Sequence, residues 1–363
     1  MARLRSIVFA FMLICGVSAA RADVTITVSY SEPADFYSMM DNVSGWLEGF
    51  VIPQYRAEWE QRFGWSAEDQ EWADRYREYR QRTFIDETQS VDPLSSADGI
   101  FASRAENTAG GDPLATYFLA QPDLRTAMAN LTSFASPQDA RMLRGFYRHF
   151  EPGWRVLLRE SGPLKGKAER LQARFDNATV EAFINRVSKF YGTSLEGEFT
   201  VYFTRHPPGN RTSAEPLAGS YILLHSPPVE EGDDRYWDAI VMHELVHYIS
   251  SRQPEEQKRE LTERFLKQCP IPDDAKRLWL VEEPLAVAWG QAAYSSIVLN
   301  NPLDPNDNWY GIPWVNTVSR TIAPSVLHAY ATEATIDGPI INELADRCAD
   351  LTTIVAQLGD EGR

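Results

Sequence analysis

The stretch Ala239–Ser250 reads AIVMHELVHYIS and places two histidines, His243 and His247, four positions apart. Residues four apart lie one turn apart on the same face of an α-helix, so both imidazoles can reach one cation. Zinc in catalytic sites takes three protein ligands and a water, and it lowers the pKa of that water to about 7. Glu244 lies beside the ligand face and is predicted to be the general base. The alternative is a core helix whose histidines bond to carbonyl groups.

The third zinc ligand is expected in the later stretch WLVEEPLA, which offers two acids at the start of a predicted helix. The pattern H-E-x-x-H-x-x-G-x-x-H fails here, because Ser250 stands at the glycine position and Gln253 at the last histidine. Both Glu282 and Glu283 are candidates. We favour Glu283 as the ligand, because the small Ala286 then lies one helical turn after it, where it can pack against the histidine helix.

HELVH followed by a helix with a ligand glutamate resembles the gluzincins, the thermolysin-like and aminopeptidase-like zinc peptidases, over roughly Glu198–Asn300. The resemblance implies a zincin-like domain, with a small antiparallel sheet beside the two ligand helices, that hydrolyses peptide bonds. Three features depart from the pattern. Pro284 replaces the usual small residue, about 35 residues separate His247 from Glu283, and the aspartate expected four residues after the ligand glutamate is absent.

The same resemblance suggests how a substrate is held. Gluzincins usually place the substrate along an edge strand that precedes the histidine helix, and SYILLHS, residues 220–226, is the candidate. Related enzymes often stabilise the oxyanion with a Tyr or His that follows the ligand helix. Tyr294, Tyr310, His328 and Tyr330 lie there, and we choose His328 and Tyr330. The other histidines considered are expected to have no ligand role: His149, His206 and His225.

The first 22 residues have the pattern of a signal peptide. A basic start, MARLR, precedes an apolar run, and small residues at Ala20 and Ala22 predict cleavage before Asp23. The protein is therefore expected to be secreted or periplasmic. An uncleaved membrane anchor is one alternative, and a lipoprotein attached through Cys15 is another, although Ile14 stands where a small residue is usual. No later segment is long and apolar enough to span a bilayer.

The charge balance restricts the partners. The net charge is -16, and the predicted leader carries three arginines and no acid, which leaves 32 Lys+Arg against 51 Asp+Glu, a net of -19. Such a chain is not expected to bind nucleic acid or an anionic membrane surface. Cys269 and Cys348 remain after leader removal and are expected to form a disulfide in an oxidising compartment, with two buried free thiols as the alternative.

The periodicity of the chain predicts a mostly helical α+β protein. DVTITVSY, residues 23–30, alternates as a strand, and helical patterns follow up to a boundary near Leu195. EFTVYFTR and SYILLHS are predicted strands, and the residues between them are expected to form a loop. We thus expect a signal peptide at 1–22, a helical region at 23–195 and a zincin-like metallopeptidase domain at 196–363.

The leading hypothesis is a zinc-dependent peptidase that acts on a peptide or protein substrate with Glu244 as general base. The second is a non-catalytic zincin-like binding protein of the cell envelope. A third is a metal-assisted hydrolase of another bond, because activated water does not dictate its substrate. The sequence does not indicate an oligomeric state.

Overall fold

The computed structural model describes most of the chain that follows the predicted leader. The described residues are 23–46, 51–84, 99–101, 112–217, 220–231, 234–269, 281–301, 304, 306, 308–336, 338–346 and 350. The predicted signal peptide and Cys348 lie outside this part of the chain, whereas Cys269 is buried and disulfide-bonded. None of the helices in the described ranges combines the length and apolar character needed to cross a bilayer.

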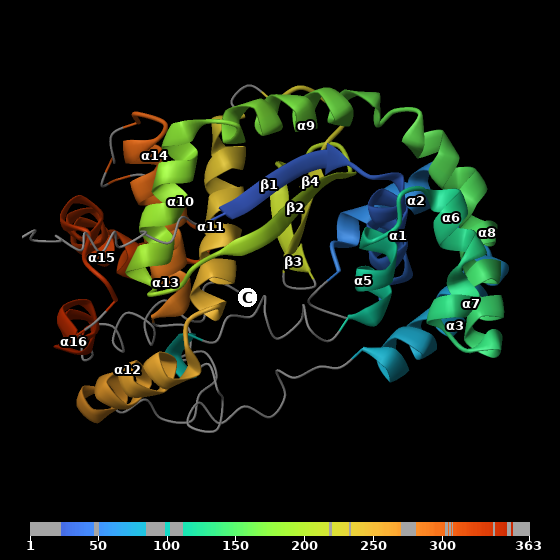
Figure 1. Cartoon of the computed structure of the whole chain (residues 1–363). Coiled ribbons are helices and arrows are strands. Elements are labelled where there is room, and N and C mark those ends of the chain that lie inside the picture. The colour runs from blue at the N-terminus through green and yellow to red at the C-terminus, as the bar shows by residue number, and fades with distance from the viewer. Residues whose placement is uncertain are drawn as a thin grey trace, which may run out of the picture.

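A four-stranded sheet lies between two groups of helices, with the strand order β1-β2-β4-β3 (Figure 1). The strands are β1 (Asp23–Tyr30), β2 (Glu196–Arg205), β3 (Ser213–Leu217) and β4 (Tyr221–Ser226). β1 and β4 both pair with β2 in parallel, and β3 is antiparallel to β4. The sheet is therefore mixed, and the expectation of an antiparallel sheet is wrong. The long helical connection between β1 and β2 permits their parallel pairing, which a tight turn cannot.

The strands bury side chains on both faces of the sheet, which explains their largely apolar sequences. In β2, Phe199, Val201 and Phe203 pack into one hydrophobic core, and the intervening Tyr202 packs against a second core. β4 repeats the alternation, with Leu223 in the second core and its neighbours in the first. Each core therefore needs its own cover of helices.

The first core is covered by the helices that carry the site (Figure 1). They are α9 (Gly162–Phe175), α10 (Ala178–Phe190), α11 (Arg235–Ser251), α12 (Glu255–Gln268), α13 (Glu282–Val287), the π-helix η4 (Ala288–Ala293), α14 (Tyr294–Ile297), α15 (Pro313–Thr332), α16 (Gly338–Asp346) and the short 3-10 turn η2 (Gly99–Phe101). The second core lies under the earlier helices on the other side of the sheet. These are α1 (Glu32–Ser44), α2 (Pro53–Phe63), α3 (Ala67–Thr83), α5 (Pro113–Leu119), α6 (Leu124–Ala129), α7 (Leu131–Phe134) and α8 (Pro137–Leu158).

The sheet joins the two sides of the predicted boundary near Leu195. β1, from the N-terminal side, pairs with β2 in register from Asp23 opposite Glu196 to Tyr30 opposite Phe203. The Gln172 side chain of α9 also bonds to the backbone of β1, accepting from one strand residue at 2.5 Å and donating to another at 3.1 Å. The region before Leu195 thus supplies one of the two outer strands of the sheet that supports the site.

Candidate active site

Helix α11 carries the two histidines of the HELVH motif side by side. The ring Nε2 atoms of His243 and His247 lie 3.0 Å apart, and both rings are buried. The rest of the helix is anchored in the first core, where Val241, Met242 and Leu245 are fully buried. The expected spacing of one helical turn therefore brings both imidazoles to one point.

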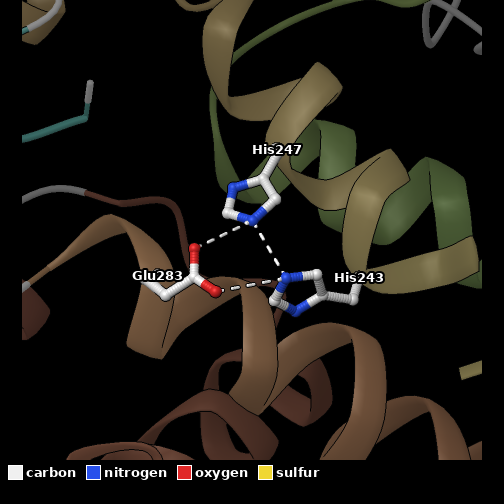
Figure 2. Close-up of side chains that lie close together, drawn as sticks. All are labelled: His243, His247 and Glu283. Atoms are coloured by element: carbon white, nitrogen blue, oxygen red, sulfur yellow. Dashed lines mark hydrogen bonds and ion pairs between the residues drawn. The ribbon is translucent and has the colours of Figure 1, made fainter. Parts of the chain in front are cut away.

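Glu283, at the start of α13, completes a group of three donors (Figure 2). One carboxylate oxygen lies 3.4 Å from His243 Nε2, and the other lies 3.2 Å from His247 Nε2. For metal–ligand distances of about 2.0–2.1 Å, the edge of a tetrahedron is about 3.3 Å. The 3.0 Å between the two Nε2 atoms is close to that edge. The contacts of 3.2 and 3.4 Å involve different oxygens of the Glu283 carboxylate, and one donor atom from each of the three residues lies within 4.8 Å of the others, so this buried group could hold a metal ion.

Glu282 lies on the opposite side of the His247 ring, away from the three converging donors. Its Oε2 atom is 2.6 Å from His247 Nδ1, and its side chain is 1% exposed, although neither atom has a well-directed hydrogen bond. A carboxylate at Nδ1 holds an imidazole so that Nε2 faces a metal, which is the usual arrangement of metal-binding histidines. The two adjacent acids thus have different positions, Glu283 in the donor group and Glu282 behind the ring.

The electrostatic surroundings favour positive charge between these groups. Burial alone would lower the pKa of His247, but Glu282 and Glu283 raise it well above its ordinary value. Burial would raise the pKa of Glu283, but the two histidines hold it well below its usual range. A bound cation would take the place of these protons, because metal ligands bind in their deprotonated forms.

Gly290 sets the distance between α11 and the segment that carries Glu283. A Cβ atom on Gly290 would lie 2.3 Å from His243 Cα and 2.4 Å from His243 N, far inside van der Waals contact. Gly290 belongs to the π-helix η4, which continues α13, and π-helical segments are frequent at functional sites. We expected Ala286 to allow the close approach. Ala286 is fully buried, but the position that touches the His243 backbone is Gly290, one turn beyond it.

A cleft of about 580 Å³ opens beside the three donors and includes His243 and Glu244 in its lining. Burial raises the pKa of Glu244, the two histidines lower it, Glu283 and Glu282 raise it further, and the net shift is upward. A carboxylate with a raised pKa accepts a proton more readily than an exposed one. The residue predicted as general base therefore lies in the cleft, next to the donor group.

The edge strand beside the cleft is β3, not the predicted SYILLHS. SYILLHS forms β4, which is paired on both sides by β2 and β3. β3 is the outer strand next to β4, and its Ser213 and Ala214 line the cleft. We expected a loop there because Pro and Gly are frequent in that stretch. Proline is compatible with an edge strand, whose outer N–H groups need no strand partner, and Pro216 lies in β3.

The structure does not place the predicted oxyanion donors at the site. His328 is exposed on α15, and Tyr330 packs against Phe183, with ring centroids 5.7 Å apart. Neither is among the residues that line the cleft, so the role of these two residues stays a prediction. Tyr310 does line it, and its ring stacks on His243 with centroids 5.7 Å apart.

His149, His206 and His225 lie outside the donor group. His149 pairs with Asp69 at 2.6 Å, and His225 pairs with Glu215 of β3 at 2.9 Å. His206 bonds through Nδ1 to a backbone oxygen at 3.1 Å. Within the described residues, the three donors His243, His247 and Glu283 are the one group with metal-ligand spacing.

Comparison with known proteins identifies no relative. No protein-family model, no curated protein and no solved structure matches the chain. The site must therefore be interpreted from its own geometry.

Proposed function

We propose that this protein is a zinc-dependent peptidase of the gluzincin type. The observation that carries the proposal is the convergence of His243 Nε2, His247 Nε2 and the Glu283 carboxylate, with Glu244 beside them in an open cleft. Two imidazoles and one carboxylate are the protein ligands of many catalytic zinc sites. Other transition metals can also bind two imidazoles and one carboxylate. We propose zinc because this combination of ligands is common in catalytic zinc sites.

The substrate would lie in the cleft along β3. As the outer strand of the sheet, β3 has one edge without a strand partner among the described residues, and an extended peptide can pair with such an edge. A peptide in that position passes the donor group, because Ser213 and Ala214 share the cleft with His243. This placement favours peptide bonds over other bonds as the target.

The residues of the chain then divide the reaction between them. Zinc, when bound, supplies Lewis-acid polarisation and makes a water acidic enough to lose a proton near neutral pH. Glu244 accepts that proton and later delivers it to the leaving amine, a role to which its raised pKa is suited. Glu282 holds the His247 ring in place, and Tyr310 replaces His328 and Tyr330 as our candidate donor to the developing oxyanion.

The experiment compares three variants of the full chain with the wild type. Glu244→Gln should keep one zinc per chain and lose peptide hydrolysis, and Glu283→Gln should lose both. Glu255→Gln on the exposed surface of α12 removes the same charge and should change neither. Zinc bound without cleavage of a broad peptide library would instead support the non-catalytic binding protein. Unchanged turnover by Glu244→Gln would remove Glu244 from the mechanism.

We also propose that the protein is exported, with cleavage before Asp23. The support is the sequence pattern of residues 1–22. N-terminal sequencing of the protein from the cell envelope or medium tests this, and a start at Met1 would contradict it.

A further inference from the structure

The described lining of the cleft has more positive than negative side chains, unlike the chain as a whole. Among the described residues, its lining contains two arginines, Arg211 and Arg235, and one carboxylate, Glu244, whereas the whole chain has a net charge of -16. Both arginines are exposed to solvent. Two cations in the binding cleft of an acidic protein suggest a local preference for a negatively charged ligand.

One continuous stripe of α11 forms the side of the cleft. Its lining residues follow a helical repeat, from Arg235 and Tyr236 through Ala239 and Ile240 to His243 and Glu244. Arg235 and His243 are eight positions apart, which corresponds to about 12 Å along the helix axis. The cleft therefore runs from the donor group, past an apolar section, to a positively charged end.

Hydrogen bonds of the neighbouring residues keep Arg211 close to Arg235 at the positively charged end of the cleft. Thr212, which follows Arg211, donates its backbone N–H to the hydroxyl of Tyr236, which follows Arg235, at 3.3 Å. Both residues also bond to Glu231, with Thr212 N at 3.1 Å from its carboxylate. The start of β3 is thereby fixed to the first turn of α11, and the two arginines flank this junction.

The acids nearest to this end are already paired with other cations. Lys167, whose side chain is fully buried, lies 3.3 Å from the Glu231 carboxylate. Asp234 lies 3.3 Å from Arg170 and 3.4 Å from Arg174. Arg211 has no ion pair with a described residue, whereas Arg235 takes part in another polar interaction. We therefore expect Arg211 to be the main partner of a ligand anion.

We propose that the cleft selects substrates that carry a carboxylate about three to four residues from the scissile bond. The distance follows from the 12 Å separation, because an extended peptide advances about 3.3 Å per residue. Ala239 and Ile240 would contact an apolar side chain in between. The carboxylate is that of an Asp or Glu side chain or of the peptide C-terminus. This inference rests on the proposed peptidase function.

The test uses zinc-loaded full-length protein and matched fluorogenic peptides. Asp, Asn or Lys is placed at each position up to five residues on either side of one fixed cleavable bond, and a C-terminal acid is compared with its amide. We expect Asp to exceed Lys in kcat/KM at a distance of three or four residues on one side. Arg211→Gln and Arg235→Gln should each reduce that preference about two- to fivefold, the range for exposed ion pairs. Higher salt should also reduce it.

Arg252→Gln is the matched control, because Arg252 is exposed at the opposite end of α11 and its loss should leave the preference unchanged. Equal rates for Asp and Lys peptides at every position, or a preference that survives both cleft variants, would overturn the inference. If no peptide is cut, the proposed function fails, and peptide binding measured by fluorescence anisotropy decides the inference separately. Tighter binding of the Asp peptides that is lost in Arg211→Gln supports it, and equal binding overturns it.

Discussion

A single added methyl group should test whether the contact at Gly290 sets the spacing of the donor group. In Gly290→Ala, the new Cβ would lie 2.3 Å from His243 Cα, whereas ordinary contacts begin near 3.4 Å. The backbone of α11 must therefore move by about 1 Å, since a backbone atom cannot rotate away. Functional constellations tolerate displacements of about 0.5 Å.

We expect two effects of Gly290→Ala. Overpacking should lower the free energy of unfolding by about 1–3 kcal/mol. The shift of His243 away from Glu283 should also weaken zinc binding by about 10–100-fold or more. That range is the usual loss of metal affinity when a residue that only orients a ligand is mutated, and here a ligand itself moves. Thermal unfolding with a chelator present measures the first effect, and zinc competition with a chromophoric chelator measures the second.

Gly166→Ala is the matched control in α9. Its Cβ would meet nothing nearer than Arg170 Nη1 at 3.8 Å, so the change should raise helix stability, by up to about 1 kcal/mol, and leave zinc affinity unchanged. If Gly290→Ala binds zinc as tightly as the wild type, the contact at His243 does not determine the ligand spacing, and our reasoning fails.

Three further predictions concern the surroundings of the site. Glu282→Gln should keep the three donors but weaken zinc binding about 10–100-fold, because His247 loses its charged partner; unchanged chelator competition would contradict this. Tyr310→Phe should keep zinc and lower kcat by about 100-fold if the hydroxyl stabilises the oxyanion, and an unaltered kcat would exclude that role. His206 should make the protein less stable in acid, because burial, with help from His225, lowers its pKa to about 4 from 6.5. The unfolded state takes up the proton first, so this contribution is present above pH 6.5 and is lost as the pH falls towards 4. Unfolding measured across that range should show a smaller loss in His206→Gln, and parallel pH profiles would refute the assignment.

The sequence predicted the local parts of the site well. Two histidines at a spacing of four need only a helix to converge, and the helix pattern around them is strong. The adjacent acids Glu282 and Glu283 were identified as a pair, and the structure assigns each a separate position. The strands β1, β2 and β4 follow from alternation or apolar runs that depend on neighbouring residues.

The features that the sequence did not predict depend on residues distant along the chain. β3 is a strand because β4 pairs with it, and its own Pro-containing sequence gives little signal. The positions of His328 and Tyr330 depend on how α15 packs, which periodicity does not determine. Gly290 had a readable signal, a glycine two turns after Glu283 in a buried helix, but its role depends on the contact with α11.

The parallel pairing of β1 with β2 has a consequence for how the chain acquires its structure. β1 is made first, but its only strand partner in the described sheet begins about 170 residues later. Closing so long a connection is entropically costly and slow, so a nascent chain must hold its first strand unpaired while the intervening helices emerge. If the gene were divided near Leu195, one fragment would contain β1 without its partner strand, and the other would expose the edge of β2 that β1 normally covers. We therefore expect the two fragments to aggregate when expressed alone and to recover only when they are made together.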